Sequence, residues 1–320
     1  MSRTGIRHRI LRAAAGAVLA GACATAVHAA GGAASTPASP SASNPAGQSG
    51  AEAALAQRLQ SVGPSLQRLP AQRRWQLESF DEGNELSATL DALVDQPFAA
   101  VAATLQSPAH WCGILMLHLY TRECRVTGAP GIAALAIAMS RTADEPLAKA
   151  DRLRFGFSAD AAAPAYVEVR MAADAGPYGT RDYRILLRAM PVDDGSRTFM
   201  QLRYGYAYGM AARMALQAYL GTFGRHKVGF TPTGRDERGE PIPIGGTRGL
   251  IERNTVRYHL GIETYLATLG VPPAQRLERR LADWFDANER HARQLHEVDR
   301  ASYLAAKRAE HQRLGESAAP

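Results

Sequence analysis

The sequence lacks the short motifs that mark the common enzyme chemistries. It contains no GxSxG nucleophile elbow, no HExxH zinc motif, no Walker A phosphate loop and no GxGxxG dinucleotide fingerprint. The glycine-rich run at 245–249 precedes an expected helix but lacks the Lys-Ser/Thr pair of a phosphate loop, so we interpret it as a flexible connection. His291 and His296 are five residues apart, out of phase for two ligands on one helical face. We therefore expect no metal, no cofactor and no catalytic residue of these classes.

The sequence also lacks a strong excess of either charge beyond its first residues. Its formal net charge is +7, from 37 Lys and Arg and 30 Asp and Glu. Residues 1–29 contain four arginines and no acidic residue, so the rest of the chain carries a formal charge of +3. Acidic and basic residues are interspersed along it. This balance gives no electrostatic basis for binding nucleic acid.

Residues 1–29 have the pattern of a cleavable secretory signal. Four arginines precede an apolar stretch at 13–22 that is too short to span a bilayer, and Val27-His28-Ala29 predicts cleavage after Ala29. We expect an exported protein, periplasmic or secreted, with no transmembrane segment in its mature form. The alternative is a lipoprotein lipidated at Cys23, because Leu19-Ala20-Gly21-Ala22-Cys23 loosely resembles the bacterial lipoprotein box, although its Leu is displaced by one position.

Cysteine is scarce, and only Cys112 and Cys124 remain after cleavage of the signal. Eleven residues separate them. In an oxidising compartment such a pair is expected to form a disulfide, worth about 2–3 kcal/mol through loop-closure entropy. The alternative is two unpaired buried thiols.

Composition divides the mature chain into four segments. Residues 30–49 are almost wholly Ala, Gly, Ser, Pro and other small or polar types, which predicts a disordered linker. Residues 50–76 contain one short amphipathic helical segment. A folded body of one domain is expected over 84–270. Residues 271–320 form a charged helical tail with nine Lys and Arg and eight Asp and Glu.

Hydrophobic periodicity predicts an α+β body. Alternation of period two indicates seven strands, with two short helices between the first and the second. After the last strand the period changes to helical at 210–223, a hairpin is expected at 228–244, and a long helix at 247–269. The seven expected strands are 85–92, 114–122, 132–141, 149–158, 166–173, 181–192 and 198–209.

The tail at 272–320 allows two interpretations. In the first, it is a solvated helix or helix pair that lies over the domain or extends from it. In the second, it is an arm that binds a protein partner or self-associates, anchored by Trp284 and Phe285.

The order of elements over 84–270 resembles the START-like superfamily, the helix-grip fold of lipid-transfer domains and polyketide cyclases. The resemblance is carried by the strand end at 91–97, the helix Phe98–Gln106 followed by Ser107-Pro108 and Trp111, and the hairpin of 183–192 with 199–208. The chain departs from the family because two helices, 210–223 and 247–269, stand where the family has one. Either of them would then be the helix that the sheet grips.

The resemblance implies a curved antiparallel sheet of about seven strands around a helix, with an apolar cavity for a lipid-like ligand. Tyr204, Tyr206 and Tyr208 share one strand face, and Tyr183 lies on a face of the preceding strand, so these rings are candidate walls. The alternative is that they are ordinary core residues.

Polar candidates for the same cavity are Arg170 and Arg203, which would hold a ligand carboxylate or phosphate if they point inward. Otherwise they belong to a solvated outer face. His118 beside Tyr120, expected in the second strand, is the best titratable candidate, and the alternative is a structural histidine.

We expect an exported protein that binds a hydrophobic or amphipathic small molecule. One alternative is an enzyme of the cyclase or hydrolase kind, which would need an inward set such as His118 with Glu168 or Arg170. Another is an adaptor that acts through its C-terminal helices.

Overall fold

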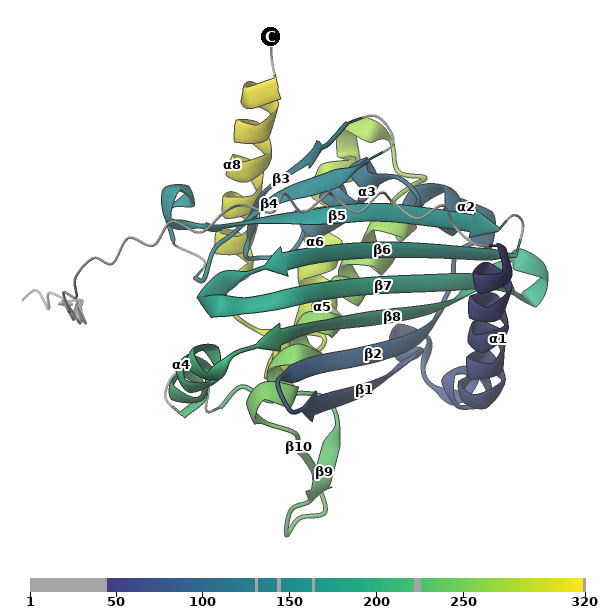
Figure 1. Cartoon of the computed structure of the whole chain (residues 1–320), viewed down its shortest axis with the longest axis horizontal. Coiled ribbons are helices and arrows are strands. Elements are labelled where there is room, and N and C mark those ends of the chain that lie inside the picture. Colours follow the sequence, from purple (N-terminus) through teal and green to yellow (C-terminus); the bar gives the residue numbers. More distant parts are fainter. Residues whose placement is uncertain (1–44, 130–131, 143–144, 163–164, 222–225, 319–320) are drawn as a thin grey trace, which may run out of the picture. The chain divides into compact units, whose positions relative to one another are not determined.

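The computed structural model describes residues 45–318, apart from 130–131, 143–144, 163–164 and 222–225 (Figure 1). The expected signal, the Cys23 site and all but the end of the expected linker lie outside the described residues.

An eight-stranded antiparallel sheet forms the body, in the order β1-β2-β8-β7-β6-β5-β4-β3. The first hairpin, β1–β2, pairs with the last strand, β8. The chain crosses from β2 to the opposite edge of the sheet through helices α2, Phe98–Leu105, and α3, Pro108–Leu115. The strands are β1 Trp75–Glu82, β2 Glu85–Val94, β3 Thr121–Thr127, β4 Ala134–Met139, β5 Asp151–Ala162, β6 Tyr166–Ala175, β7 Thr180–Val192 and β8 Arg197–Tyr208.

The strand β1 was missed by the sequence analysis, which began the folded body at residue 84. Its inward positions include Ser79, which is buried, and Asp81, so it lacks the apolar alternation that marks a strand. The next difference is at β3, which begins at Thr121. Residues 116–120, expected inside a strand, form the turn that follows α3. The other six predicted strands are present, with shifted ends.

Short connections contain four 3-10 turns. They are η1 Ala71–Arg73, η2 Leu147–Lys149, η3 Pro177–Gly179 and η4 Asp193–Gly195. In η4, Asp193, Asp194 and Gly195 all have positive φ, a conformation that Asp tolerates and Gly favours. The Asp-Gly signal in the sequence therefore marks the β7–β8 hairpin.

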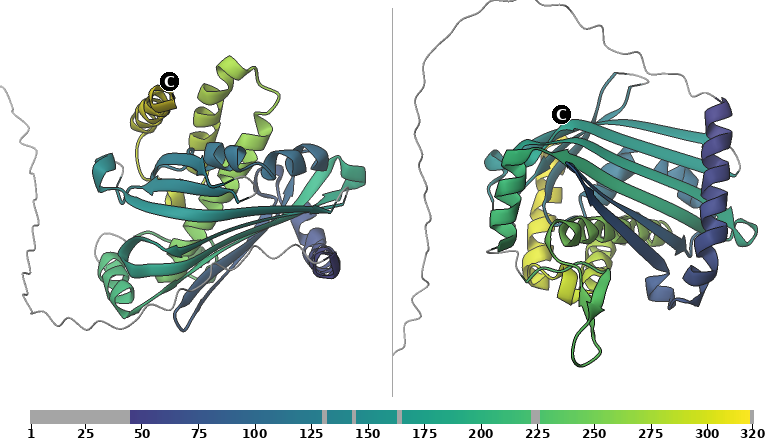
Figure 2. Two further views of the ribbon diagram at one scale, coloured as in Figure 1. Left: turned by 45° about the horizontal axis from the view of Figure 1, so that its top comes forward. Right: turned by 60° about the horizontal axis from the view of Figure 1, so that its bottom comes forward.

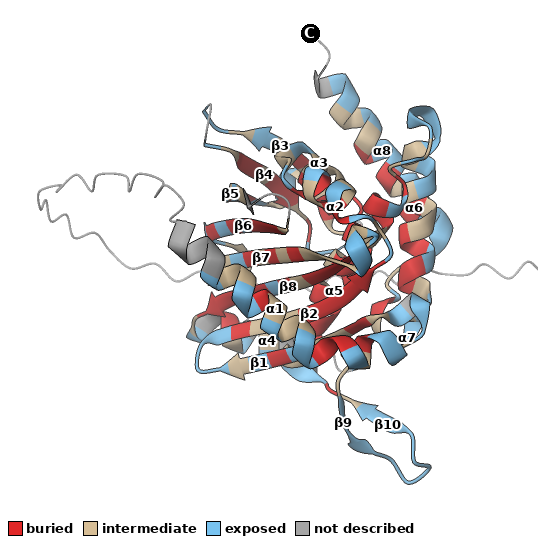
Figure 3. Ribbon diagram, turned by 90° about the vertical axis from the view of Figure 1, so that its right-hand side faces the viewer, coloured by how far each residue is buried: buried red, intermediate tan, exposed pale blue. Residues whose placement is uncertain are grey.

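One long helix, α5, Gly246–Ala267, lies against the inner face of the sheet, which bends around it (Figure 2). It packs on β1, β2 and β8, and its buried positions run along most of its length (Figure 3). Helix α4, Met210–Gly221, lies at one end of the strands and exposes Met210 and Met214. The gripped helix is therefore α5, the second of the two helices that the sequence left open.

Helix α5 is held by a buried carboxylate. Glu252 is 0% exposed and accepts hydrogen bonds from Ser79 Oγ of β1 at 2.6 Å, Phe230 N at 2.6 Å and Thr231 N at 3.0 Å. A Cβ on Gly229 would lie 2.5 Å from Glu252 Oε2, so only glycine permits this close approach. The segment after Gly229 continues into an exposed hairpin of β9, Pro232–Arg235, and β10, Pro241–Pro243.

One end of the outer face of the sheet is covered by α1, Pro45–Arg68, which runs across the strands on the side opposite α5 (Figure 1). Arg58 of α1 donates to the buried carboxylate of Asp91 at 2.8 Å. The expected short helix within 50–76 is thus a longer helix that packs on the body. The apolar contact consists of Leu55, Val62 and Leu66 with Leu93, Tyr166 and Phe199.

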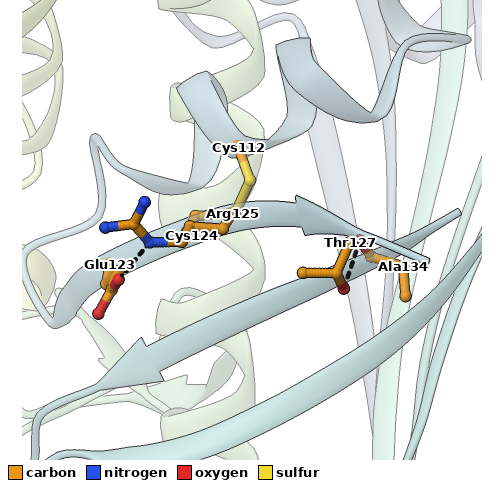
Figure 4. The surroundings of a disulfide bond; sticks show 6 residues. All are labelled: Cys112, Glu123, Cys124, Arg125, Thr127 and Ala134. Atoms are coloured by element: carbon orange, nitrogen blue, oxygen red, sulfur yellow. Dashed lines mark hydrogen bonds and ion pairs between the residues drawn. A yellow bond between two sulfur atoms is a disulfide. The ribbon is translucent and has the colours of Figure 1, made fainter. Parts of the chain in front are cut away.

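A disulfide joins Cys112 of α3 to Cys124 of β3, with their Cα atoms 5.3 Å apart (Figure 4). The pairing predicted from the two mature cysteines is present. It ties the crossover helix to the strand at the edge of the sheet.

The C-terminal helices α6, Pro273–Glu289, α7, Ala292–Leu295, and α8, Arg300–Ala318, pack on the body. Trp284 and Phe285 are buried against Tyr303, whose hydroxyl donates to Leu117 O at 2.8 Å. Lys307 donates to Thr121 O, also at 2.8 Å. Trp284 and Phe285 are therefore interior residues of this chain rather than exposed anchors. Over the described residues, no helix combines the length and the apolar character needed to cross a membrane.

The disulfide predicts a measurable loss of stability on its removal. Replacing both Cys112 and Cys124 by Ser should lower the free energy of unfolding by about 2–3 kcal/mol, because the closed loop no longer restricts the unfolded chain. Urea unfolding of the oxidised protein and the double variant measures this difference. Reductant should shift the wild-type curve to that of the variant and leave the variant unchanged, and a wild-type curve insensitive to reductant would contradict the prediction.

The packed tail predicts that Tyr303 contributes to global stability. Tyr303→Ala should cost about 3–5 kcal/mol, because it empties a site between Trp284 and Leu117. The matched variant Tyr303→Phe loses only one hydrogen bond and should cost about 1 kcal/mol. Thermal unfolding followed by circular dichroism compares the two. If Tyr303→Ala and Tyr303→Phe both left the thermal stability nearly unchanged, the tail would be a free arm.

Candidate functional site

A cavity lies between the inner face of the sheet and α5, on the side where the helix no longer packs against the strands. Because α5 packs on β1, β2 and β8, it stands away from β4, β5 and β6. The cavity has an inner chamber of about 150 Å³ and an outer chamber of about 340 Å³. Both chambers share walls from β4, β7, β8 and α5, including Met139, Tyr183, Tyr206 and Asn254, so they adjoin.

The inner chamber has aromatic walls. The rings of Tyr183 and Tyr206 stack with centroids 5.0 Å apart, and Tyr204 meets Tyr206 at 5.9 Å and Tyr258 of α5 at 5.4 Å. Apolar side chains of β4 to β7 form much of the remaining lining, together with the polar side chains of Thr121, Ser140 and Asn254. None of the described lining residues is Asp, Glu, Lys or Arg. The tyrosine face predicted for β8 and the Tyr183 face of β7 therefore meet in one chamber.

The tyrosine hydroxyls of this chamber stay protonated. Burial raises the pKa of Tyr204, Tyr206 and Tyr258 above the usual value for a phenol. Each hydroxyl can then both donate and accept a hydrogen bond at neutral pH. Such walls can cover an apolar ligand and still orient its polar atoms.

His118 lines the inner chamber from the turn before β3, not from within a strand as the sequence analysis expected. It is 3% exposed, and its ring stacks on Tyr258 with centroids 5.3 Å apart. Nδ1 accepts a hydrogen bond from the backbone N–H of Tyr120 at 3.3 Å. No described residue is within hydrogen-bonding geometry of Nε2.

The charge of His118 follows from its surroundings. Burial lowers its pKa well below the usual value, and the positive charges of Arg257 and Lys307 add to the effect. The neutral ring accepts at Nδ1, so its proton lies on Nε2. His118 is thus a neutral hydrogen-bond donor with spare capacity at the chamber wall.

The outer chamber has a cationic wall. Arg253 and Arg257 lie one turn apart on α5, and Lys227 lies on the segment that leads to β9. Arg257 donates to Glu297 at 2.7 Å and to Leu295 O at 3.1 Å, while Lys227 also pairs with Glu297. None of these residues was among the candidates predicted from the sequence. The available signal was the spacing of residues 250, 253, 254, 257 and 258, which share one helical face that carries two arginines.

Tyr120 and Tyr208 also reach the outer chamber. Tyr120 lines both chambers, as does Tyr183. The hydroxyl of Tyr208 donates to Asp81, and Arg213 of α4 lies over its ring, 5.6 Å from the centroid. All four tyrosines predicted as walls, Tyr183, Tyr204, Tyr206 and Tyr208, therefore face the cavity.

Arg170 and Arg203 do not face the cavity. Val169 and Met171 of β6 point to the core, so Arg170 points outward, where it pairs with Asp160 at 2.8 Å. Arg203 is exposed between the inward residues Leu202 and Tyr204. The structure therefore corrects their assignment as ligand-binding candidates, and the outer-face alternative holds for both arginines.

The catalytic set considered from the sequence is not assembled. Glu168 is buried on the outer face, where it accepts from Arg188 at 2.7 Å. The sheet therefore separates Glu168 and Arg170 from His118, which lies on the inner side.

The architecture is a helix grip: a bent antiparallel sheet closed around one long helix, as the resemblance to the START-like superfamily implied. No protein-family model and no curated protein sequence matches this chain.

Solved helix-grip structures are similar to part of this chain at low identity. The crystal structure of Ara h 8.0201 covers 60% of this chain and 99% of its own, with 8% identity and a TM-score of 0.35. Norcoclaurine synthase of Thalictrum flavum covers 47% and 91%, with 10% identity and a TM-score of 0.32. The Zhui aromatase/cyclase of Streptomyces sp. R1128 covers 47% and 87%, with 15% identity and a TM-score of 0.31. At these values the similarities carry no conclusion about function.

The neutral state of His118 predicts acid sensitivity. In the unfolded chain the imidazole takes up a proton near pH 6.5, whereas in the folded chain it does so only at lower pH, so its contribution to stability is present above pH 6.5 and is lost as pH falls below that value. The slope approaches about 1.4 kcal/mol per pH unit. His118→Phe keeps a ring against Tyr258 and should flatten the pH dependence of thermal unfolding between pH 6.5 and 5. The control His296→Asn, at an exposed position, should retain the wild-type dependence.

Proposed function

We propose that this protein is exported and binds a hydrophobic or amphipathic, lipid-like small molecule in the cavity between the sheet and α5. The observation that carries the proposal is the inner chamber, where tyrosine rings from two strands and α5 enclose an uncharged space. The outer chamber of about 340 Å³ falls in the size range of small-molecule sites, and the inner chamber adds to it.

Binding is favoured over catalysis by the chemistry of the inner wall. His118 is the only histidine among its described lining residues, burial holds the pKa of that imidazole well below its usual value, and no described carboxylate lines the chamber to orient the ring or to share its proton. A cyclase or hydrolase would need such a partner for general acid–base chemistry. The tyrosine hydroxyls and His118 Nε2 instead supply hydrogen bonds that position a ligand.

Export is supported by two features. The N-terminal sequence has the pattern of a secretory signal, and the disulfide requires an oxidising compartment to persist.

The binding proposal is tested by closing the cavity. Met139 of β4 lines both chambers, so Met139→Trp should fill the passage between them and weaken binding of pyrenebutanol, an uncharged fluorescent probe, by about tenfold or more. The matched control is Phe80→Trp, an exposed position on β1 that faces away from α5.

Fluorescence titration measures the Kd, and thermal unfolding confirms that both variants fold. Native mass spectrometry of protein purified from its export compartment should show a small molecule in the wild type that is reduced in Met139→Trp. Equal probe binding by Met139→Trp and Phe80→Trp would place the probe elsewhere and refute the proposal.

A further inference from the structure

We infer that the outer chamber is a subsite for an anion, so that the bound molecule carries a carboxylate or a phosphate at one end. This inference rests on the proposed binding function and adds the charge and the orientation of the ligand. It starts from the ionisable groups of the lining. The described residues that line the outer chamber include four cationic side chains and two carboxylates, an excess of two formal positive charges.

The two carboxylates are already engaged. Asp151 accepts two hydrogen bonds from Arg141, at 2.8 and 2.9 Å, which balances one cation at the rim. Glu297 is shared by Arg257 and Lys227, so one negative charge faces two positive ones. Arg253, which has an interaction partner of its own, adds a third cation to this wall.

Burial makes the excess costly. Arg253 is 1% exposed and Arg257 is 3% exposed, so bulk water does little to screen either guanidinium. The two residues are four apart on α5 and therefore lie on the same helical face. An anion in the chamber would offset the repulsion between them, and a guanidinium is well matched to a carboxylate or a phosphate because it can donate two parallel hydrogen bonds.

The shared walls give the ligand a direction. The inner chamber is uncharged among its described residues and has His118 as a neutral donor, whereas the outer chamber carries the cations. Tyr120, Tyr183 and Tyr206 line both chambers and connect them. The apolar body of the ligand would lie inside against the tyrosines, and its anionic group would lie outside against α5.

The test uses probes that differ only in the end group. Wild-type protein should bind pyrenebutanoic acid about tenfold or more tightly than pyrenebutanol, and this preference should shrink as ionic strength rises. A pyrenebutyl phosphate identifies which anion is preferred. Inorganic phosphate alone, used as competitor, shows whether the anion is recognised without an apolar body.

Charge removal tests the residues. Arg253→Met should lower the ratio of acid to alcohol affinity toward one, and Arg253→Lys should retain part of it. Lys227→Met, at a partly exposed position, is a second variant that keeps α5 intact. The control is Arg203→Met on the outer face, which removes an exposed arginine and should leave the ratio at its wild-type value.

The outcomes separate the two proposals. If the alcohol binds as tightly as the acid, or if Arg203→Met changes the ratio as much as Arg253→Met and Lys227→Met do, the anion subsite is refuted while the binding function stands. If neither probe binds the wild type, the binding function fails, and the subsite fails with it.

Discussion

The buried carboxylate of Glu252 is the interaction on which the cavity depends. It accepts hydrogen bonds from Ser79 on β1 and from the backbone of Phe230 and Thr231, so it joins the long helix to the sheet edge and to the segment before β9. A buried carboxylate is stable only with such hydrogen-bond partners. Their positions fix the orientation of α5 about its own axis. That orientation turns Arg253, Asn254, Arg257 and Tyr258 toward the cavity.

The cavity itself follows from where α5 touches the sheet. The helix packs on the β1, β2 and β8 side, while the sheet continues through β7 to β3. Among the described residues, no long helix lies against the inner face of the strands beyond β8 near the cavity, and side chains of moderate size such as Ile137, Leu153 and Met171 do not fill the remaining space. Tyr183, Tyr204 and Tyr206 line the gap, and their hydroxyls keep it partly polar.

Much of the fold could be predicted because its strands alternate regularly. The phase of Tyr204, Tyr206 and Tyr208 on β8 was read correctly, since period two depends only on spacing. The same rule excludes Arg203 from the cavity, because it is adjacent to Tyr204, so the two candidates could not both point inward.

Other errors had a chemical cause. Strand β1 was missed because its buried Ser79 is satisfied by Glu252, a partner 173 residues away that no local pattern reveals. Arg253 and Arg257 were missed because they are charged residues on a helix. Such residues are normally assigned to its solvent face. The spacing of these two shows only that they share one helical face, and the three-dimensional structure shows that this face lines the cavity.

At three other places in the described chain, buried charge is met by a nearby opposite charge. Asp91 pairs with Arg58, Glu168 with Arg188 and Arg170, and Lys307 with Glu310. In these places burial is supported by ion pairs within the protein, as the cost of desolvation requires. The outer chamber departs from this pattern at Glu297, a single carboxylate that Arg257 and Lys227 share. A protein that meets buried charge with opposite charge at these three places, and leaves one carboxylate between two cations where a cavity opens, is suited to take further negative charge from a ligand.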